Sequence, residues 1–446
     1  MGRAGIVTIR KRGIRAGAAV LATFALAAVT QAEPRALTLD EAVALAKRNA
    51  PGVVQAQGQT RTRAAGVRAA YASFLPNVNL TAGATRQLPS GGATRVENGQ
   101  VITLPSQPWS SSIGLGASVE VFDGGRRLFD IRQARALATA AEVNESAQLF
   151  NAALAAKQSY FDVLAARESQ AAAAAQLGQA ELQRKTSIAR ARARVATRSD
   201  SLRAEIQVRS ARLAVMDADN ALATANAALT RATGSTEPVT AATADSLPPP
   251  ALALDDAALA ALLTAAPTVR QAEAERSAAH AASSASWTDY LPSLTASYSR
   301  SGSGTGGSPT LRSDDFDYAG SLRMSLSFPL FNQWQREQQA TQARVAERNA
   351  EAALRDTRLA AEESLTRLLG TFRSSAERVA SLQATVEAAE EDLRVQQQRY
   401  AAGGSTLLDV LSSQTQLDQA RRDLIRARYD QRVAKAQLEA LVGRDL

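Results

Sequence analysis

The sequence contains no cysteine, which excludes disulfide bonds, thiolate metal sites and a cysteine nucleophile. Aromatic residues are also scarce, at 4% of the 446 residues, and alanine is abundant. This composition offers little bulk for a globular core but suits long helices that pack through small side chains. The single histidine, His280, is interpreted as a surface residue of a helix, so no metal or cofactor site is expected.

Proline is absent from two long stretches of the chain. All 14 prolines lie outside residues 124–234 and 332–446, which are therefore predicted to be helical with one interruption each. The first helix of each stretch would have about 70 residues and a length of about 105 Å. The return helix covers about half of that length, and residues 40–73 or 255–290 cover the other half. One long helix is therefore expected to lie beside two shorter ones stacked end to end.

The first 32 residues have the pattern of a signal peptide, with five basic residues before an apolar run at 16–29. We predict cleavage after Ala32. An uncleaved membrane anchor is the alternative, but 14 apolar residues are short for a span. Loss of this segment lowers the net charge from +8 to +3, so the basic composition does not indicate nucleic-acid binding.

No motif of an enzyme is present. The sequence has no phosphate-binding loop, nucleophile elbow or HExxH pattern, so we expect no catalytic residues. An acidic run at residues 390–392 is interpreted as a solvated helix face.

The rest of the chain is a tandem duplication. Residues 37–51 (LTLDEAVALAKRNAP) recur at 252–267, and a Thr-x-x-Asp-x-Leu motif at Thr197 recurs 209 residues later at Thr406. We predict a first repeat over residues 33–234, a proline-rich linker at 235–250 and a second repeat over 251–446.

Four segments alternate strictly between apolar and polar residues, at about residues 77–87, 111–122, 293–303 and 318–328. Period two predicts strands with one apolar and one polar face, and their length suits tilted membrane strands. In the second strand we assign Val119 to the lipid face and Ser118 to the polar face. A charge at Val119 should therefore weaken insertion, whereas one at Ser118 should be tolerated.

Aromatic residues gather at both ends of these strands, as in the interface girdles of membrane barrels. Trp109, Phe316 and Tyr318 lie on the loop side. The residues predicted at the helix-side membrane interface are Phe74, Phe122, Trp287, Tyr290, Phe328, Phe331 and Trp334. The alternative is a pair of surface hairpins packed on a soluble bundle, which has no need of two girdles.

Four strands cannot close a barrel alone, and open strand edges in lipid leave backbone groups unpaired. The chain must therefore oligomerise through its strands. Two, three or four copies are compatible with the sequence, and three would give a 12-stranded barrel with a water-filled lumen.

The chain resembles the TolC-type outer-membrane factor family in the order of its repeats and in several motifs. These motifs are the Leu-Pro pairs at 75–76 and 291–292, Phe-Asp-Gly-Gly at 122–125 and both Thr-x-x-Asp-x-Leu motifs. The resemblance implies a mainly α-helical homotrimer, in which long helical hairpins form a periplasmic tunnel and four strands per chain join a 12-stranded β-barrel in outer-membrane lipid. It implies an exit duct for an efflux pump or type I secretion system, with a periplasmic adaptor and an inner-membrane pump as partners. The alternative is a secreted helical scaffold or adhesin-like rod without a channel.

Each Thr-x-x-Asp motif is chemically a helix start and would form a hairpin tip. The resemblance implies that Asp409, with Tyr400, Gly403 and Thr406, narrows the tunnel entrance; the alternative is that Asp409 only caps its helix. Asp200, with Thr197, is interpreted as structural. Ser405 and Ser412 stand where relatives can carry charged residues, which argues against a salt-bridged lock.

Overall fold

The computed structural model describes most of the chain after the predicted signal peptide, which lies outside the described residues. Parts of the predicted linker and of the two strand loops are also outside them. The described residues are 34–88, 94–97, 99–103, 109–242, 250, 252, 255–306, 308–309 and 316–446. Among them, no helix is both long and apolar enough to cross a membrane.

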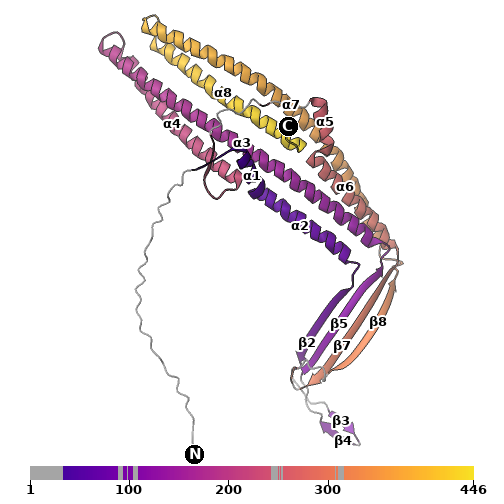
Figure 1. Cartoon of the computed structure of the whole chain (residues 1–446). Coiled ribbons are helices and arrows are strands. Elements are labelled where there is room, and N and C mark those ends of the chain that lie inside the picture. The colour runs from indigo at the N-terminus through magenta and orange to yellow at the C-terminus, as the bar shows by residue number, and fades with distance from the viewer. Residues whose placement is uncertain are drawn as a thin grey trace, which may run out of the picture. The chain divides into compact units, whose positions relative to one another are not determined.

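Two long antiparallel helical hairpins dominate the fold (Figure 1). The first joins α3 (Arg126–Arg192) to α4 (Arg198–Thr233), and the second joins α7 (Gln335–Ala401) to α8 (Leu407–Val442). Helices α3 and α7 have 67 residues each, about 100 Å at 1.5 Å per residue, and α4 and α8 have 36 each. The two hairpins pack against each other through α3 and α8.

Shorter helices complete each repeat. In the first repeat they are α1 (Leu39–Asn49) and α2 (Pro51–Ala72). In the second they are α5 (Asp256–Leu262), the 3₁₀ turn η1 (Leu263–Ala265), α6 (Pro267–Ala285) and the 3₁₀ turn η2 (Ser286–Tyr290). The sequence predicted one shorter helix in each of these segments, over residues 40–73 and 255–290, which was wrong, because each segment is divided before a proline, Pro51 or Pro267. Ala50 adopts φ −59° and ψ 131°, because the residue before a proline is driven out of the helical region.

The short helices stack end to end with the return helices, as expected. Helix α4 ends at Gly234, where a Cβ would lie 2.8 Å from the Cβ of Asn49 at the end of α1. Helix α8 ends at Gly443, where a Cβ would lie 2.6 Å from Cγ of Pro267, the first residue of α6. Both glycines have positive φ, +62° and +71°, which suits the left-handed C-cap that ends a helix.

Four strands form one antiparallel sheet in the order β2-β5-β7-β8 (Figure 1). Their bounds are β2 (Asn77–Arg86), β5 (Trp109–Phe122), β7 (Ser293–Gly306) and β8 (Asp317–Ser327). A small hairpin, β3 (Thr94–Glu97) and β4 (Gln100–Thr103), lies between β2 and β5 in sequence, where only a loop was expected.

The register of the sheet gathers apolar side chains on one face, since residues paired across antiparallel strands lie on the same face. The apolar face carries Val78 and Leu80 of β2, Leu115, Ala117 and Val119 of β5, Leu294, Ala296 and Tyr298 of β7, and Leu322, Met324 and Leu326 of β8. A shift between Glu120 and Phe122 leaves Val121 as a bulge, so Phe122 pairs with Leu294 and joins the same face.

The segment predicted as a linker contributes a strand. There, β6 (Val239–Ala241) pairs in parallel with β1 (Arg35–Leu37). Leu37 and Ala241 are fully buried in this ribbon. Arg167 of α3 donates hydrogen bonds to the Thr240 hydroxyl (2.9 Å) and the Ala241 carbonyl (2.7 Å), which fixes the ribbon to the first hairpin.

Candidate functional site

The two hairpin tips have the same local geometry. At each tip a threonine is the N-cap and the aspartate three residues later completes a capping box. The Thr197 amide donates to the Asp200 carboxylate at 3.0 Å, and the Thr406 amide donates to Asp409 at 2.8 Å. Both threonine hydroxyls donate to the same carboxylates at 2.8 Å. The repeated motif therefore starts α4 and α8 in the same way.

These hydrogen bonds lower the pKa of both aspartates. For Asp409 the largest cause is the Thr406 amide, followed by the Thr406 hydroxyl; for Asp200 the hydroxyl of Thr197 comes first. Both side chains are therefore charged at neutral pH. Asp409 is exposed, so its carboxylate reaches solvent while it caps α8. Capping α8 therefore leaves the Asp409 carboxylate accessible at the hairpin tip.

Tyr400, at the tip of the second hairpin, contacts the tip of the first. Arg190, near the end of α3, donates to the Tyr400 carbonyl at 3.0 Å and lies over its ring at 4.4 Å. Gly403 has φ +81°, and the Gly404 amide closes the turn onto the Arg399 carbonyl at 2.8 Å. Arg194 takes the same left-handed position in the first tip, at φ +62°. Arg190 was not singled out from the sequence.

Ser405 and Ser412 stand where the resemblance allows charged residues, and among the described residues both make contacts only within the second hairpin. The Ser405 hydroxyl donates to the Gln396 carbonyl at 3.3 Å, within its own hairpin. Ser412 lines a groove of about 690 Å³ between α7 and α8, together with Leu382, Leu408 and Asp423.

We expect Thr406→Ala to loosen the start of α8 by about 1 kcal/mol, since an N-cap hydroxyl typically contributes 0.5–2 kcal/mol. Amide hydrogen exchange in the first turn of α8 should be about fivefold faster. The contribution of Asp409 should be present above the unfolded pKa of about 3.9 and be lost as the pH falls through its lowered folded pKa.

The control for this variant is Thr415→Ala. Thr415 is exposed inside α8, beyond its first two turns, where its hydroxyl donates to the Leu411 carbonyl, and alanine favours helix interiors. Equal exchange rates in the two variants would contradict a capping role for Thr406.

A row of polar side-chain contacts joins the two hairpins, and it was not predicted from the sequence. Lys157 pairs with Glu439 at 2.5 Å, Gln176 donates to Asp418 at 2.5 Å, and the Tyr429 hydroxyl donates to Glu168 at 2.5 Å. Asp418 is buried, and burial raises its pKa, while the Gln414 amide opposes the shift. These contacts hold α8 against α3 at defined levels along the hairpins.

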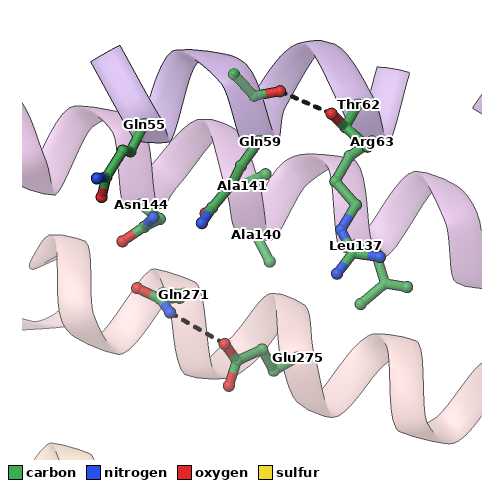
Figure 2. Close-up of a pocket in the computed structure, with 11 residues that line it drawn as sticks. Gln55, Gln59, Thr62, Arg63, Leu137, Ala140, Ala141, Asn144, Gln271 and Glu275 are labelled. Carbon is green, nitrogen blue, oxygen red and sulfur yellow. Dashed lines mark hydrogen bonds between the residues drawn. The ribbon is translucent and has the colours of Figure 1, made fainter. Parts of the chain in front are cut away.

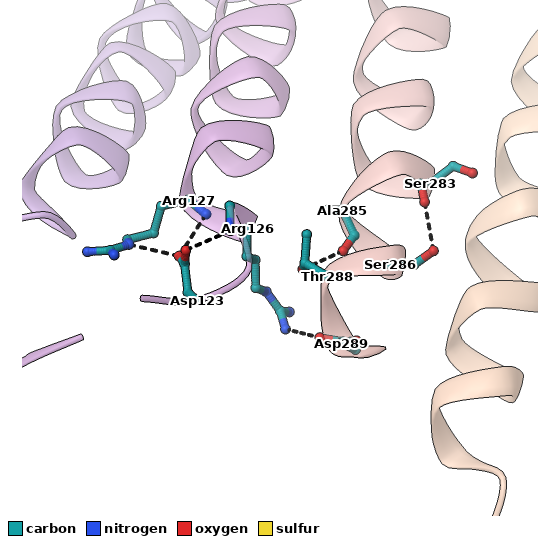
Figure 3. Close-up of polar contacts among 9 residues, drawn as sticks. Asp123, Arg126, Arg127, Ser283, Ala285, Ser286, Thr288 and Asp289 are labelled. Carbon is teal, nitrogen blue, oxygen red and sulfur yellow. Dashed lines mark hydrogen bonds and ion pairs between the residues drawn. The ribbon is translucent and has the colours of Figure 1, made fainter. Parts of the chain in front are cut away.

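The sheet meets the helices at two places, which we call the strand–helix corners. The first corner joins α2 to β2 and β5 to α3, and the second joins η2 to β7 and β8 to α7. Asp123 organises the first corner (Figure 3). Its carboxylate accepts hydrogen bonds from the amides of Gly125 and Arg127, both at 3.0 Å, and from the Arg127 Nε at 2.8 Å. The Arg127 guanidinium lies over the Phe74 ring at 4.3 Å. Hydrogen bonds from Arg127 and Gly125 outweigh burial, and the pKa of Asp123 is lowered.

The predicted interface aromatics lie at the two strand–helix corners. Phe74 and Phe122 belong to the first corner, and the other five to the second. Six of the seven are exposed, namely Phe74, Phe122, Trp287, Phe328, Phe331 and Trp334, and Tyr290 is half-buried. A ring of exposed aromatics at the end of a sheet with one apolar face is typical of a membrane interface.

A hollow of about 850 Å³ lies over α3, between α2 and α6 (Figure 2). Its side chains are mostly amides, from Gln55, Gln59, Asn144 and Gln271, with Arg63 and Glu275 at its sides. Gln271 donates to Glu275 at 3.0 Å. Such a lining of hydrogen-bonding side chains favours water. In the part of the chain that the structure describes, no three His, Asp or Glu side chains gather to hold a metal ion.

The sequence matches the family model described as outer membrane efflux protein over residues 42–235 and 258–444. Protein CyaE of Bordetella pertussis is 28% identical over 351 residues, which are 76% of this chain and 70% of that protein. The solved channel CusC aligns with a TM-score of 0.76 at 19% identity, covering 91% of this chain and 92% of the other. The open state of MtrE from Neisseria gonorrhoeae aligns with a TM-score of 0.72 at 22% identity, covering 92% and 89%.

The matched family defines the class of the protein, which is an outer-membrane export protein and not an enzyme. The chain belongs to the outer membrane efflux protein family. The resemblance inferred from the tandem motifs is thereby confirmed.

Proposed function

We propose that three copies of this chain assemble into an outer-membrane exit duct with a 12-stranded β-barrel. The observation that carries the proposal is the sheet, which has one apolar face and two outer strands. Among the described residues, β2 and β8 each pair with only one neighbour in this sheet. In lipid the free edges would leave backbone groups without hydrogen bonds, at several kcal/mol each.

Strand direction supports closure between copies. Neighbouring strands of the sheet are antiparallel throughout, so β2 and β8 run in opposite directions. The β8 strand of one copy would thus pair with β2 of the next in the same antiparallel manner. Two copies would give eight strands, whose interior side chains fill, whereas three copies leave an aqueous lumen.

The helical hairpins would continue this duct into the periplasm. Helix α4 exposes Leu202, Ile206, Leu213 and Met216, each more than half exposed, along one stripe. A neighbouring copy would cover this stripe, since an apolar stripe of this length on a helix marks a packing surface. Each repeat, 33–234 and 251–446, would then supply one hairpin and two strands to the wall.

The duct would serve an export machine of the tripartite efflux or type I secretion kind. Its partners would be a periplasmic adaptor and an inner-membrane pump, with lipid around the barrel and no nucleic acid. The family description and the solved efflux channels support this function. A secreted helical scaffold, the alternative, would have no use for a sheet with an apolar face and exposed aromatic corners.

Conductance in planar lipid bilayers tests the proposal. Detergent-extracted protein should sediment as a trimer and form steady channels. A water-soluble monomer without conductance would exclude a duct.

We further expect Asp409→Asn to reduce the preference of these channels for cations without affecting trimer assembly. Three carboxylates at a constriction attract cations and repel anions, and asparagine removes the charge while it can still accept a hydrogen bond at the cap. The measurement is the reversal potential in a salt gradient. Asp200→Asn in the first tip is the matched control and should leave the reversal potential unchanged. Unchanged selectivity in Asp409→Asn would leave Asp409 with the capping role alone.

A further inference from the structure

The two strand–helix corners differ by one carboxylate. Asn332 stands in the second repeat where Asp123 stands in the first, and Arg336 corresponds to Arg127. Arg127 is neutralised by Asp123 at 2.8 Å, with both side chains about nine-tenths buried. Arg336 instead donates to the backbone carbonyls of Pro329 (2.9 Å) and Leu330 (3.3 Å).

The second corner also has unsatisfied polar atoms. The Nε of Arg336 and the Oδ1 of Asn332 are buried without a hydrogen-bond partner. The equivalent Nε of Arg127 is the atom that contacts Asp123. Within the described residues, no ion pair joins Arg336 to a carboxylate, and the buried Oε2 of the neighbouring Glu337 has no hydrogen-bond partner either.

Arg336 is the end of a continuous stack of four side chains. Its guanidinium lies over the Tyr290 ring at 4.9 Å, and the Tyr290 and Trp287 rings are 5.8 Å apart. Arg344 lies over Trp287 at 5.8 Å. We call these residues, Arg336, Tyr290, Trp287 and Arg344, the arginine–aromatic stack. Arg344 likewise takes part in no ion pair in the described part of the chain.

The acidic residue of η2, Asp289, already has an ion-pair partner. Asp289, between Trp287 and Tyr290 in sequence, pairs with Arg126 of α3 at 2.7 Å (Figure 3). The stack therefore presents two positive charges beside exposed aromatic rings. Trp334 and Phe331, within two residues of Asn332, are 69% and 72% exposed, and their rings are 6.5 Å apart.

The position of Arg336 places its charge at the head-group level. Helix α7 begins at the sheet, and helical side chains lean toward the helix N-terminus, so Arg336, in the first turn of α7, leans toward the sheet. Exposed Trp and Tyr rings mark the membrane–water interface, and the head-group layer is about 5–7 Å deep on each side.

We propose that the arginine–aromatic stack binds the phosphate of an anionic phospholipid in the leaflet on the helix side of the membrane. This proposal rests on the proposed function, because it requires the sheet to lie in a bilayer. A guanidinium matches a phosphate with paired hydrogen bonds, and basic pockets at membrane surfaces select anionic head groups. The phosphate would neutralise the charge of Arg336, as the Asp123 carboxylate neutralises that of Arg127. Each chain would hold one such lipid, at the second corner only.

The test is Asn332→Asp, which gives the second corner the carboxylate of the first. Wild-type protein and the variant are reconstituted in vesicles of one part phosphatidylglycerol to four parts phosphatidylcholine. They are then extracted gently, and the retained lipids are counted by native mass spectrometry. The wild type should retain phosphatidylglycerol in preference to phosphatidylcholine, and the variant should lose this preference by about fivefold or more.

Gln338→Asp is the control for added negative charge. Gln338 is exposed in the first turn of α7, but residues two apart on a helix do not face each other, so its side chain does not lie beside Arg336. It should retain phosphatidylglycerol like the wild type. An unchanged preference in Asn332→Asp, or an equal loss in Gln338→Asp, would overturn the proposal. Conductance of the same samples separates the two proposals. Channels without a lipid preference contradict the lipid site alone, whereas a wild type that neither inserts nor conducts contradicts the duct.

Discussion

Replacing Leu322 by arginine is expected to destabilise the protein folded in a membrane by about 2–4 kcal/mol per chain. Leu322 lies near the middle of β8, is 74% exposed and pairs with Tyr298 on the apolar face of the sheet. An arginine there would place a charge in hydrocarbon at the depth where the cost is highest. The measurement is the fraction of protein folded into vesicles across a urea titration.

Ser321→Arg is the matched control. Ser321 pairs with Ser299 on the polar face, and Arg323 of the wild-type chain already lies on that face. This variant should therefore fold as the wild type does, within about 0.5 kcal/mol. A similar loss in both variants would mean that the sheet does not separate lipid from lumen. Arginine at Val119 should act like arginine at Leu322 but more weakly, because Val119 is closer to the aromatic corner.

Gly443→Ala is expected to destabilise the fold by about 2–4 kcal/mol. A left-handed backbone costs a residue with a side chain about 1 kcal/mol or more, and overpacking adds about 1–3 kcal/mol. Gly443 has φ +71°, and a Cβ there would lie 2.6 Å from Cγ and 2.7 Å from Cδ of Pro267. A rigid proline ring cannot move aside as a flexible side chain would. Thermal unfolding followed by helical circular dichroism measures the loss.

Gly370→Ala provides the comparison within the same repeat. Gly370 lies inside α7, and a Cβ there would meet nothing within 4 Å. Alanine should stabilise this helix by about 0.5–1 kcal/mol, so the two substitutions should shift the transition in opposite directions. A stable Gly443→Ala protein would show that α8 and α6 do not abut as described.

The long helices and their caps could be predicted from the sequence because both depend on local chemistry. Proline-free stretches allow long helices, and the capping boxes of Thr197 and Thr406 involve residues only three positions apart. The alternation of the strands likewise indicates which face is apolar. The shift of Phe122 onto that face could not be predicted, because a bulge depends on the register with β7.

Contacts between distant segments were not predictable in the same way. Gln176 and Asp418 are 242 residues apart, and each alone looks like a solvated helix residue. The pairing of β6 with β1 also depends on the whole first repeat lying between them. Residues 239–241 occur in a proline-rich segment, where three residues are too few for a period to be read.

The end-to-end stacking has a mechanical consequence. Each repeat has one uninterrupted helix, α3 or α7. Beside it lie shorter helices stacked end to end, and they meet at a joint, Asn49–Gly234 in the first repeat and Pro267–Gly443 in the second. A continuous helix resists stretching, because elongation breaks its backbone hydrogen bonds, whereas a joint held by side-chain contact can pivot without breaking any. Torsion applied at the tip of a hairpin should therefore be taken up at the two joints, whereas α3 and α7 should keep the distance between the tip and the sheet constant.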